Sequence, residues 1–126
     1  MTFEEVKIKE LKDITEIVSG DQCYLREIWH TVNDQMNIHY SLAYAFILPS
    51  GRTLNHYLSY SETYFIISGS GLMHAGETTF KIKNGTSFCI QPFMPQWIEN
   101  TGDIKLEFLV IVDPAWNKKE EVILES

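Results

Sequence analysis

The chain has 126 residues, of which 44% are hydrophobic and 21% charged, a balance typical of one folded globular domain rather than of a disordered chain. Seventeen acidic residues against ten lysines and arginines give a net charge of −7. This acidity argues against nucleic acid or an anionic membrane as a partner, because both need a clustered positive field. No apolar run reaches the roughly 20 residues of a transmembrane helix, and no signal-peptide pattern opens the chain. We therefore expect a cytoplasmic protein.

Short apolar runs separated by glycine-containing turns are the main pattern of the chain. Residues 11–18 alone show helix-like spacing, over a short segment. The later runs are rich in β-branched and aromatic residues, and several strands at such spacing predict an all-β sandwich or barrel. Residues 122–124 are expected to add an edge strand to this chain or to a partner chain. The expected strands are residues 23–30, 40–48, 63–67, 78–82, 86–90, 97–99 and 104–112.

The two cysteines, Cys23 and Cys89, lie far apart in the sequence and form no CxxC motif. A pair of this kind in an acidic cytoplasmic chain is typical of two small buried hydrophobic side chains. We expect that structure for both, rather than a redox or metal role.

Strand parity places several polar side chains on shared faces, since successive residues of a strand point to opposite sides. His56, Leu58 and Tyr60 share one face, and Glu62 shares a face with Tyr64. If these faces turn inward, the barrel has a polar centre. A polar centre in a small barrel usually marks a site, because unpaired polar groups are costly to bury.

The stretch from Gly51 to Gly71 resembles the first motif of the cupin family, G-x5-H-x-H-x3-4-E-x6-G. His56 matches its first histidine, Glu62 its glutamate and Gly69 its closing glycine, while Gly51 lies one residue closer to the histidine than the pattern has it. The resemblance implies a jelly-roll β-barrel of two antiparallel sheets, with at most a short N-terminal helix.

The stretch from Gly85 to Asn100 resembles the second cupin motif, G-x5-P-x-G-x2-H-x3-N, whose two ends these residues match. Gln91 replaces the proline of the pattern and Phe93 replaces its glycine. The two motifs appear in order, and the resemblance covers roughly residues 40–114.

The resemblance implies one small cupin domain of the conserved-barrel type over residues 1–126, with a core at about residues 22–114. It also implies a homodimer, formed through sheet edges or exchanged N-terminal strands. The segment 1–20 and the tail 113–126 are the parts available for that contact. The expected partners are therefore a small-molecule ligand and a second copy of the chain, without nucleic acid or membrane.

The resemblance also implies where a metal would bind, because metal-binding cupins use three histidines and one glutamate. Those positions here are His56, Leu58, Glu62 and Gln96. Leucine ligates nothing, and glutamine offers only a weak neutral oxygen, so the ligand set is degenerate. His56, Glu62 and Gln96 remain as candidate ligands for one divalent ion (Zn, Fe, Mn or Ni), or for none. In the alternative without metal, His56 and Glu62 satisfy each other by a hydrogen bond.

The function that the resemblance implies is a small-molecule enzyme that acts at the barrel centre. Among cupin activities, the incomplete ligand set favours isomerase-like or epimerase-like proton transfer on a carbonyl or sugar-like substrate, with or without a weakly held metal. The alternatives are a cupin that binds a small ligand without catalysis, and a purely structural barrel. The expected catalytic residues are His56, Glu62 and Tyr44.

A second set of residues is expected to bind the substrate, although the apolar and aromatic residues in it are also typical of a hydrophobic core. The set consists of Gln96, Tyr64, Tyr60, Phe88, Met73 and Leu58.

Overall fold

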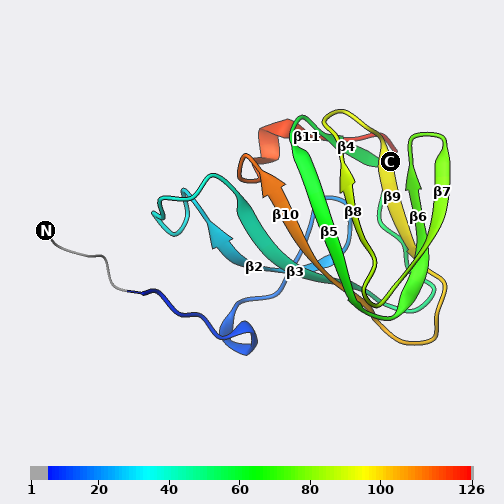
Figure 1. Ribbon diagram of the computed structural model, residues 1–126, viewed down its shortest axis with the longest axis horizontal. Coiled ribbons are helices and arrows are strands. Elements are labelled where there is room, and N and C mark those ends of the chain that lie inside the picture. Colours follow the sequence, from blue (N-terminus) through cyan, green and yellow to red (C-terminus); the bar gives the residue numbers. More distant parts are fainter. Residues whose placement is uncertain (1–5, 126) are drawn as a thin grey trace, which may run out of the picture.

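The secondary structure of the chain consists mainly of β-strands (Figure 1). The computed structural model describes residues 6–125. In chain order its elements are η1 (Leu11–Asp13), β1 (Ile17–Val18), β2 (Tyr24–His30), β3 (Ser41–Ile47), β4 (His56–Leu58), β5 (Ser61–Ser68), β6 (Ser70–Ala75), β7 (Thr78–Lys83), β8 (Ser87–Ile90), β9 (Gln96–Asn100), β10 (Leu106–Asp113), η2 (Lys118–Glu120) and β11 (Glu121–Ile123).

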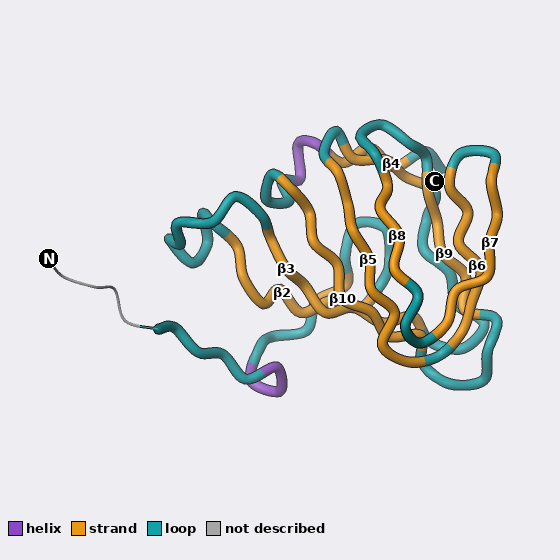
Figure 2. The backbone as a smooth tube through the Cα atoms, in the orientation of Figure 1, coloured by secondary structure: helices purple, strands orange, loops and turns teal. Residues whose placement is uncertain are grey.

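Two antiparallel sheets face each other and enclose the core (Figure 2). The six-stranded sheet has the order β1-β2-β3-β10-β5-β8, and the five-stranded sheet has the order β11-β4-β9-β6-β7. Neighbours in each sheet are mostly distant in sequence, as in a jelly roll. The predicted fold class is therefore confirmed. Within residues 6–125, no helix has the length and apolar character that crossing a membrane requires.

The structure contains every predicted strand to within a residue or two at each end, and adds three that were not predicted. The expected helix-like segment forms only the short turn η1, because Ile17 and Val18 pair with β2 as strand β1. The strands β4 and β6 were missed, the first for its length of 3 residues and the second for its glycine and serines. Residues 122–124 do contribute an edge strand, since β11 pairs with β4 of the same chain. The homodimer stays a prediction.

The buried face of each central strand follows the alternation of the sequence. In β10, Leu106, Phe108, Val110 and Val112 are all buried, and the residues between them are more exposed. In β3, by contrast, two of the buried positions are the small Ala43 and Ala45. The interior is therefore filled by large side chains along β10 and leaves space beside β3.

The two cysteines differ in burial. Cys23 is 5% exposed, as expected, but Cys89 is exposed on β8, and both are free thiols. The expectation of burial is wrong for Cys89, because its side chain points to the outer face of β8, where it lies near Thr63.

Left-handed backbone explains the glycines of both motifs. Gly69 and Gly85 have φ angles of 88° and 93°, and a Cβ on Gly69 would lie 2.5 Å from the carbonyl oxygen of Lys105. Phe93 stands where the second motif has glycine, and its φ angle is 70°. Phe93 therefore has the left-handed backbone that glycine adopts most readily. Its ring lies against Tyr57, with 6.0 Å between the ring centroids.

Asn100, the last residue of the second motif, joins three backbone groups. Its Nδ2 donates to the carbonyl oxygens of Ile47 at 2.9 Å and Ile104 at 2.8 Å, and its Oδ1 accepts from the backbone nitrogen of Gly102 at 2.9 Å. The side chain is 4% exposed. Asn100 therefore fixes the loop between β9 and β10 to the end of β3.

Replacement of Asn100 by alanine removes these three bonds. We expect Asn100→Ala to lower the free energy of unfolding by about 2–3 kcal/mol, because buried backbone groups lose their partners. Urea denaturation of the two proteins measures the difference. Asn84→Ala, in the exposed turn between β7 and β8, is the matched control and should change stability by less than about 0.5 kcal/mol. Equal effects of the two substitutions would contradict this role for Asn100.

Candidate functional site

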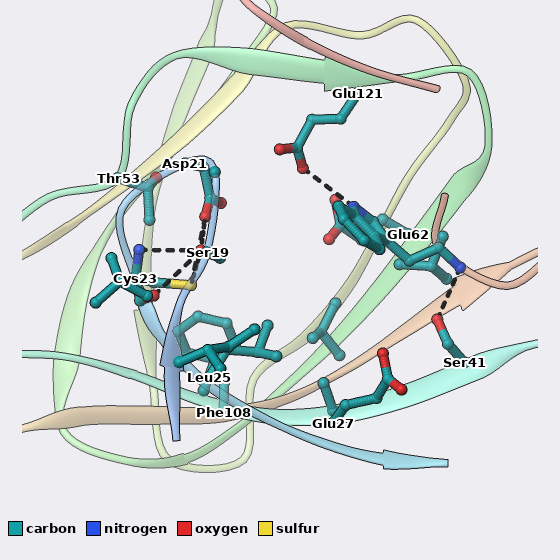
Figure 3. A pocket seen from close by; sticks show the side chains of 18 of the residues that line it. Ser19, Asp21, Cys23, Leu25, Glu27, Ser41, Thr53, Glu62, Phe108 and Glu121 are labelled. Carbon is teal, nitrogen blue, oxygen red and sulfur yellow. Dashed lines mark hydrogen bonds between the residues drawn. The ribbon is translucent and has the colours of Figure 1, made fainter. Parts of the chain in front are cut away.

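A cavity of about 390 Å³ opens beside β3 in the space that the alanines leave (Figure 3). Strands β2, β3, β5 and β10 form most of its wall, and the β1–β2 turn and the segment from Trp116 to Glu121 complete it. Its apolar part consists of Ile17, Val18, Leu25, Ala43, Ala45, Ile98, Phe108, Val110 and Val112.

Glu62 on β5 is the most enclosed charged group of the cavity wall, with 9% of its surface exposed. Its Oε1 accepts a hydrogen bond of 2.8 Å from Nε2 of Gln96. The Oε1 of Gln96 in turn accepts a bond of 2.6 Å from the hydroxyl of Tyr64. Because Glu62 and Tyr64 lie on β5 and Gln96 on β9, this chain of bonds joins the two sheets at the barrel centre.

Burial raises the pKa of Glu62 from 4.5 to about 7. The loss of hydration is the largest cause, and the nearby charge of Asp21 adds to it. The positive charge of His56 and the hydrogen bonds from Tyr64 and Gln96 act in the opposite direction, since they favour the carboxylate. Glu62 therefore exchanges a proton near neutral pH, as a general acid or base must.

His56 on β4 lies next to Gln96 across the strand pair β4–β9. The ring is 2% exposed, and its Nδ1 lies 2.7 Å from the carbonyl oxygen of Leu54, which can only accept a hydrogen bond. Nδ1 therefore carries a proton. The other nitrogen, Nε2, lies 3.5 Å from Oδ2 of Asp21. When Nε2 also carries a proton, the ring and this carboxylate form an ion pair.

Asp21 belongs to a tight turn that ends at the cavity. Its second oxygen, Oδ1, accepts from the hydroxyl of Ser19 and lies 3.5 Å from the Sγ of Cys23. Burial raises the pKa of the Cys23 thiol well above its usual value, and the Asp21 charge raises it further. Cys23 is thus a protonated thiol in the wall and not an activated nucleophile.

Glu121, the first residue of β11, faces the turn from the other side of the cavity mouth (Figure 3). Its Oε2 accepts a bond of 3.2 Å from the indole nitrogen of Trp116. Burial raises the pKa of Glu121, and the charge of Asp21 adds to this effect. The mouth therefore has one carboxylate on each side.

The structure brings four of the predicted site residues together: His56, Glu62, Gln96 and Tyr64. The expected hydrogen bond between His56 and Glu62 is replaced by two others, since His56 faces Asp21 and Glu62 faces Gln96. Both polar groups are satisfied, by partners that the sequence did not indicate.

The expected place of Tyr44 needs correction. Ala43 and Ala45 turn toward the cavity, so Tyr44, which lies between them in β3, points to the opposite face of the sheet. Its hydroxyl donates to the Glu107 carboxylate, and both this bond and burial raise its pKa. Tyr44 therefore does not lie in the site with His56 and Glu62.

Five of the six residues expected to bind substrate lie outside the cavity lining, and so does His56. Gln96 is connected to the cavity through its hydrogen bonds to Glu62 and Tyr64. Leu58 and Met73 are 2% and 0% exposed and belong to the hydrophobic core. Tyr60 and Phe88 are partly buried and pack against that core, and Phe88 stacks on Tyr64 with 4.7 Å between ring centroids. The structure thus places these side chains in the packing that supports the site.

The residues at the metal positions of the cupin motifs do not fit a metal centre. Leu58 has no donor atom, and both ends of the Gln96 amide are engaged with Tyr64 and Glu62. The Nε2 of His56, the ring nitrogen left free once Nδ1 binds a backbone carbonyl, faces Asp21 at 3.5 Å. Among the described residues, no group of three or more His, Cys, Asp or Glu side chains is arranged to hold a metal ion.

Sequence reasoning missed Asp21, Cys23, Trp116 and Glu121 as parts of this site. All four lie outside the two motifs, in segments that were interpreted as an N-terminal extension, a strand end and a tail. The one available signal was the acidic and aromatic character of these segments, which is equally typical of a solvated surface.

The fold and the polar centre define a double-stranded β-barrel with a buried carboxylate on the wall of its cavity. The sequence profile described as "Cupin domain" matches residues 44–112. The "Uncharacterized protein MJ1618" of Methanocaldococcus jannaschii is 33% identical over 118 residues, which cover 92% of this chain and 93% of that protein. The chain therefore belongs to the cupin family.

Solved structures with the same fold confirm the architecture. The polyketide cyclase RemF from Streptomyces resistomycificus has a TM-score of 0.81 at 14% identity, covering 97% of this chain and 87% of that chain. A predicted oxalate decarboxylase from Thermotoga maritima has a TM-score of 0.75 at 21% identity, covering 86% and 99%. A protein with a double-stranded β-helix domain from Klebsiella pneumoniae has a TM-score of 0.73 at 17% identity, covering 97% and 100%. At these identities the likeness is one of fold.

The raised pKa of Glu62 predicts a pH-dependent cost to stability. Between pH 4.5 and about 7 the folded protein holds a proton that the unfolded chain has released, so stability falls as the pH rises through this range. Glu62→Gln has no such proton. We therefore expect the stability of Glu62→Gln relative to wild type to increase from pH 4.5 to pH 8 by about 3 kcal/mol.

Urea denaturation of both proteins across this pH range measures the change. Glu77→Gln, in the exposed turn between β6 and β7, is the matched control and should show a constant difference from wild type. A constant difference for Glu62→Gln as well would show that Glu62 titrates near its ordinary value.

Proposed function

We propose that this cupin is a small-molecule enzyme that transfers a proton on a carbonyl compound without negative charge, in the manner of an isomerase or epimerase. One observation carries the proposal: the Glu62 carboxyl is buried on the wall of a cavity, and its pKa is raised to about 7. A carboxyl group with this pKa accepts and returns a proton at neutral pH with similar ease.

The proposed step begins with Glu62 as the base. Its carboxylate takes the proton from the carbon next to the carbonyl group, and the electrons of the broken C–H bond move to the carbonyl oxygen as an enolate. In an epimerisation, Glu62 then returns the proton to the other face of the same carbon. In an isomerisation of an α-hydroxy carbonyl compound, Glu62 gives the proton to the former carbonyl carbon, and the proton of the neighbouring hydroxyl passes to the enolate oxygen. Gln96 and Tyr64 hold the carboxylate in place during both transfers.

The charge of the cavity argues against oxalate, the substrate that the name of the Thermotoga protein indicates for that protein. Asp21, Glu27, Glu62 and Glu121 all line the cavity, whereas Lys118 is the one lysine or arginine among the described lining residues. A dianion would be repelled in such surroundings, because like charges interact strongly in a partly dehydrated site.

Cupin domains often bind a divalent metal, and the expectation for this chain was one such ion or none. We propose that the proton transfer needs no resident metal. The support is the donor chemistry: a leucine and a glutamine replace two histidines, and both ends of the Gln96 amide are engaged in hydrogen bonds within the protein.

Metal content tests this part of the proposal. Protein purified without a nickel column or chelators should hold Zn, Fe, Mn and Ni far below one equivalent by elemental mass spectrometry, and His56→Ala should hold no less than wild type. Near-stoichiometric metal in the wild type that is lost in His56→Ala would contradict the proposal and would favour a metal-assisted enzyme.

Exchange of carbon-bound hydrogen tests the reaction itself. In D₂O, wild type should incorporate deuterium next to the carbonyl of at least one compound in a panel of neutral and amino-substituted ketones, β-diketones and reducing sugars, observed by NMR. Glu62→Gln should slow this exchange by about 10²-fold or more, because the base is lost. The rate of wild type should rise with pH through an apparent pKa near 7.

Two tyrosine variants form the matched control. Tyr64→Phe removes the hydroxyl that orients Gln96 and should slow exchange, whereas Tyr44→Phe changes only the outer face of β3 and should not. If Glu62→Gln alters ligand affinity while no compound shows exchange, the protein is a binding module without catalysis, which is the alternative function.

A further inference from the structure

The charges around the cavity are strongly unbalanced. Among residues 6–125, four carboxylates line it, those of Asp21, Glu27, Glu62 and Glu121, against the single amine of Lys118. Three of these carboxylates belong to separate parts of the fold: the β1–β2 turn, β5 and β11. Their convergence on one hollow is therefore a product of the tertiary structure and not of a local run of acidic residues.

The carboxylates at the mouth are fixed in position (Figure 3). Trp116 donates from its indole nitrogen to Oε2 of Glu121. The other oxygen, Oε1, lies so close to the turn that a Cβ on Gly20 would be 2.5 Å away from it. The carbonyl oxygen of Asp21 accepts a 2.7 Å bond from the backbone of Leu54, which ties the turn to the chain before β4.

The two nearby arginines are engaged elsewhere and do not balance these charges. Arg26, on β2, points away from the cavity, where its guanidinium donates to the carbonyl oxygen of Leu11 and pairs with Glu16. Arg52 pairs with Glu125 and lies over the Trp97 ring at 4.3 Å from its centroid. The ring of His56 is already placed against Asp21.

The rest of the cavity is apolar and has room for an organic group. Ala43, Ala45 and Val110 form one side of it, and Phe108 supplies an aromatic surface. A ligand that fills this part loses water from its apolar surface, which favours binding. The part nearer the mouth, by contrast, offers oxygen acceptors with negative charge.

We infer that the cavity selects molecules in which an apolar body carries a positively charged nitrogen, with the nitrogen between Asp21 and Glu121 and the body on the alanine wall. An ammonium group there separates carboxylates that otherwise repel each other, whereas an anion adds to the repulsion. The inference rests on the proposed function, since it concerns the same cavity and names the charge of the substrate: an amino ketone or amino sugar rather than a keto acid.

Three probes with the same ring isolate the effect of charge: 2-phenylethylamine, 2-phenylethanol and 3-phenylpropionate. Binding is measured by calorimetry at pH 7.5 and low salt, with thermal shift as a second readout. We expect the amine to bind about tenfold or more tightly than the alcohol, and the carboxylate to bind more weakly than either. Added salt should weaken binding of the amine and leave the affinity for the alcohol unchanged.

Two isosteric variants locate the effect. Glu121→Gln retains an oxygen that accepts the Trp116 hydrogen bond and removes one charge at the mouth. The affinity for the amine should therefore fall several-fold, and the affinity for the alcohol should stay unchanged. Asp21→Asn should act in the same direction. Glu77→Gln, on the exposed β6–β7 turn outside the cavity lining, removes the same charge from the protein and should change none of the three affinities.

Equal affinities for the three probes, no detectable binding of the amine at millimolar concentration, or an equal effect of Glu77→Gln and Glu121→Gln would overturn the inference. A failure of the proposed function looks different. In that case deuterium exchange is absent, or it continues unchanged in Glu62→Gln, while the preference for the amine and its loss in Glu121→Gln persist.

Discussion

Gln96 is the side chain on which the polar centre of this barrel depends. Its amide nitrogen donates to Glu62 and its amide oxygen accepts from Tyr64, so one residue of β9 fixes two residues of β5 across the interior. Without these bonds a carboxyl group in this position would be a buried charge without partners, which protein interiors seldom tolerate. With them, Glu62 stays in place while its proton affinity remains high. The conflict between burial and hydrogen bonding is what sets its pKa near neutrality.

The alternation along β5 and β9 and the spacing of the two motifs predicted both the fold and the core of the site. His56, Glu62 and Gln96 are all interior, as the sequence indicated. The same reasoning failed in β3 for a physical reason. There the inward positions are alanines, which give a weak hydrophobic signal, and the aromatic Tyr44 on the outward face is easily taken for core. Small side chains leave the space that forms the cavity. The same small side chains give a weak hydrophobic pattern, so the sequence does not reveal the cavity.

The acidic half of the site had no local signature that distinguishes it from a solvated surface. Asp21 and Glu121 are 100 residues apart in the chain, and each belongs to a segment that looks like a solvated terminus. They meet because β1 pairs with β2 at one edge of the first sheet and β11 pairs with β4 at one edge of the second. Edge strands of this length are specified by tertiary packing rather than by propensity. The cupin motifs therefore describe the inner wall of the barrel, and the terminal segments decide what reaches it.

The absence of a side chain at Gly20 has a consequence for the entry and exit of molecules at the cavity mouth. Any Cβ at this position would meet Oε1 of Glu121, so the width of the opening is set by a residue that takes no part in the polar centre. An alanine there would push the two rims apart or tilt the carboxylate away from Trp116. Entry and exit of a bound molecule are thus adjustable at the rim, while the chemistry at Glu62 stays untouched.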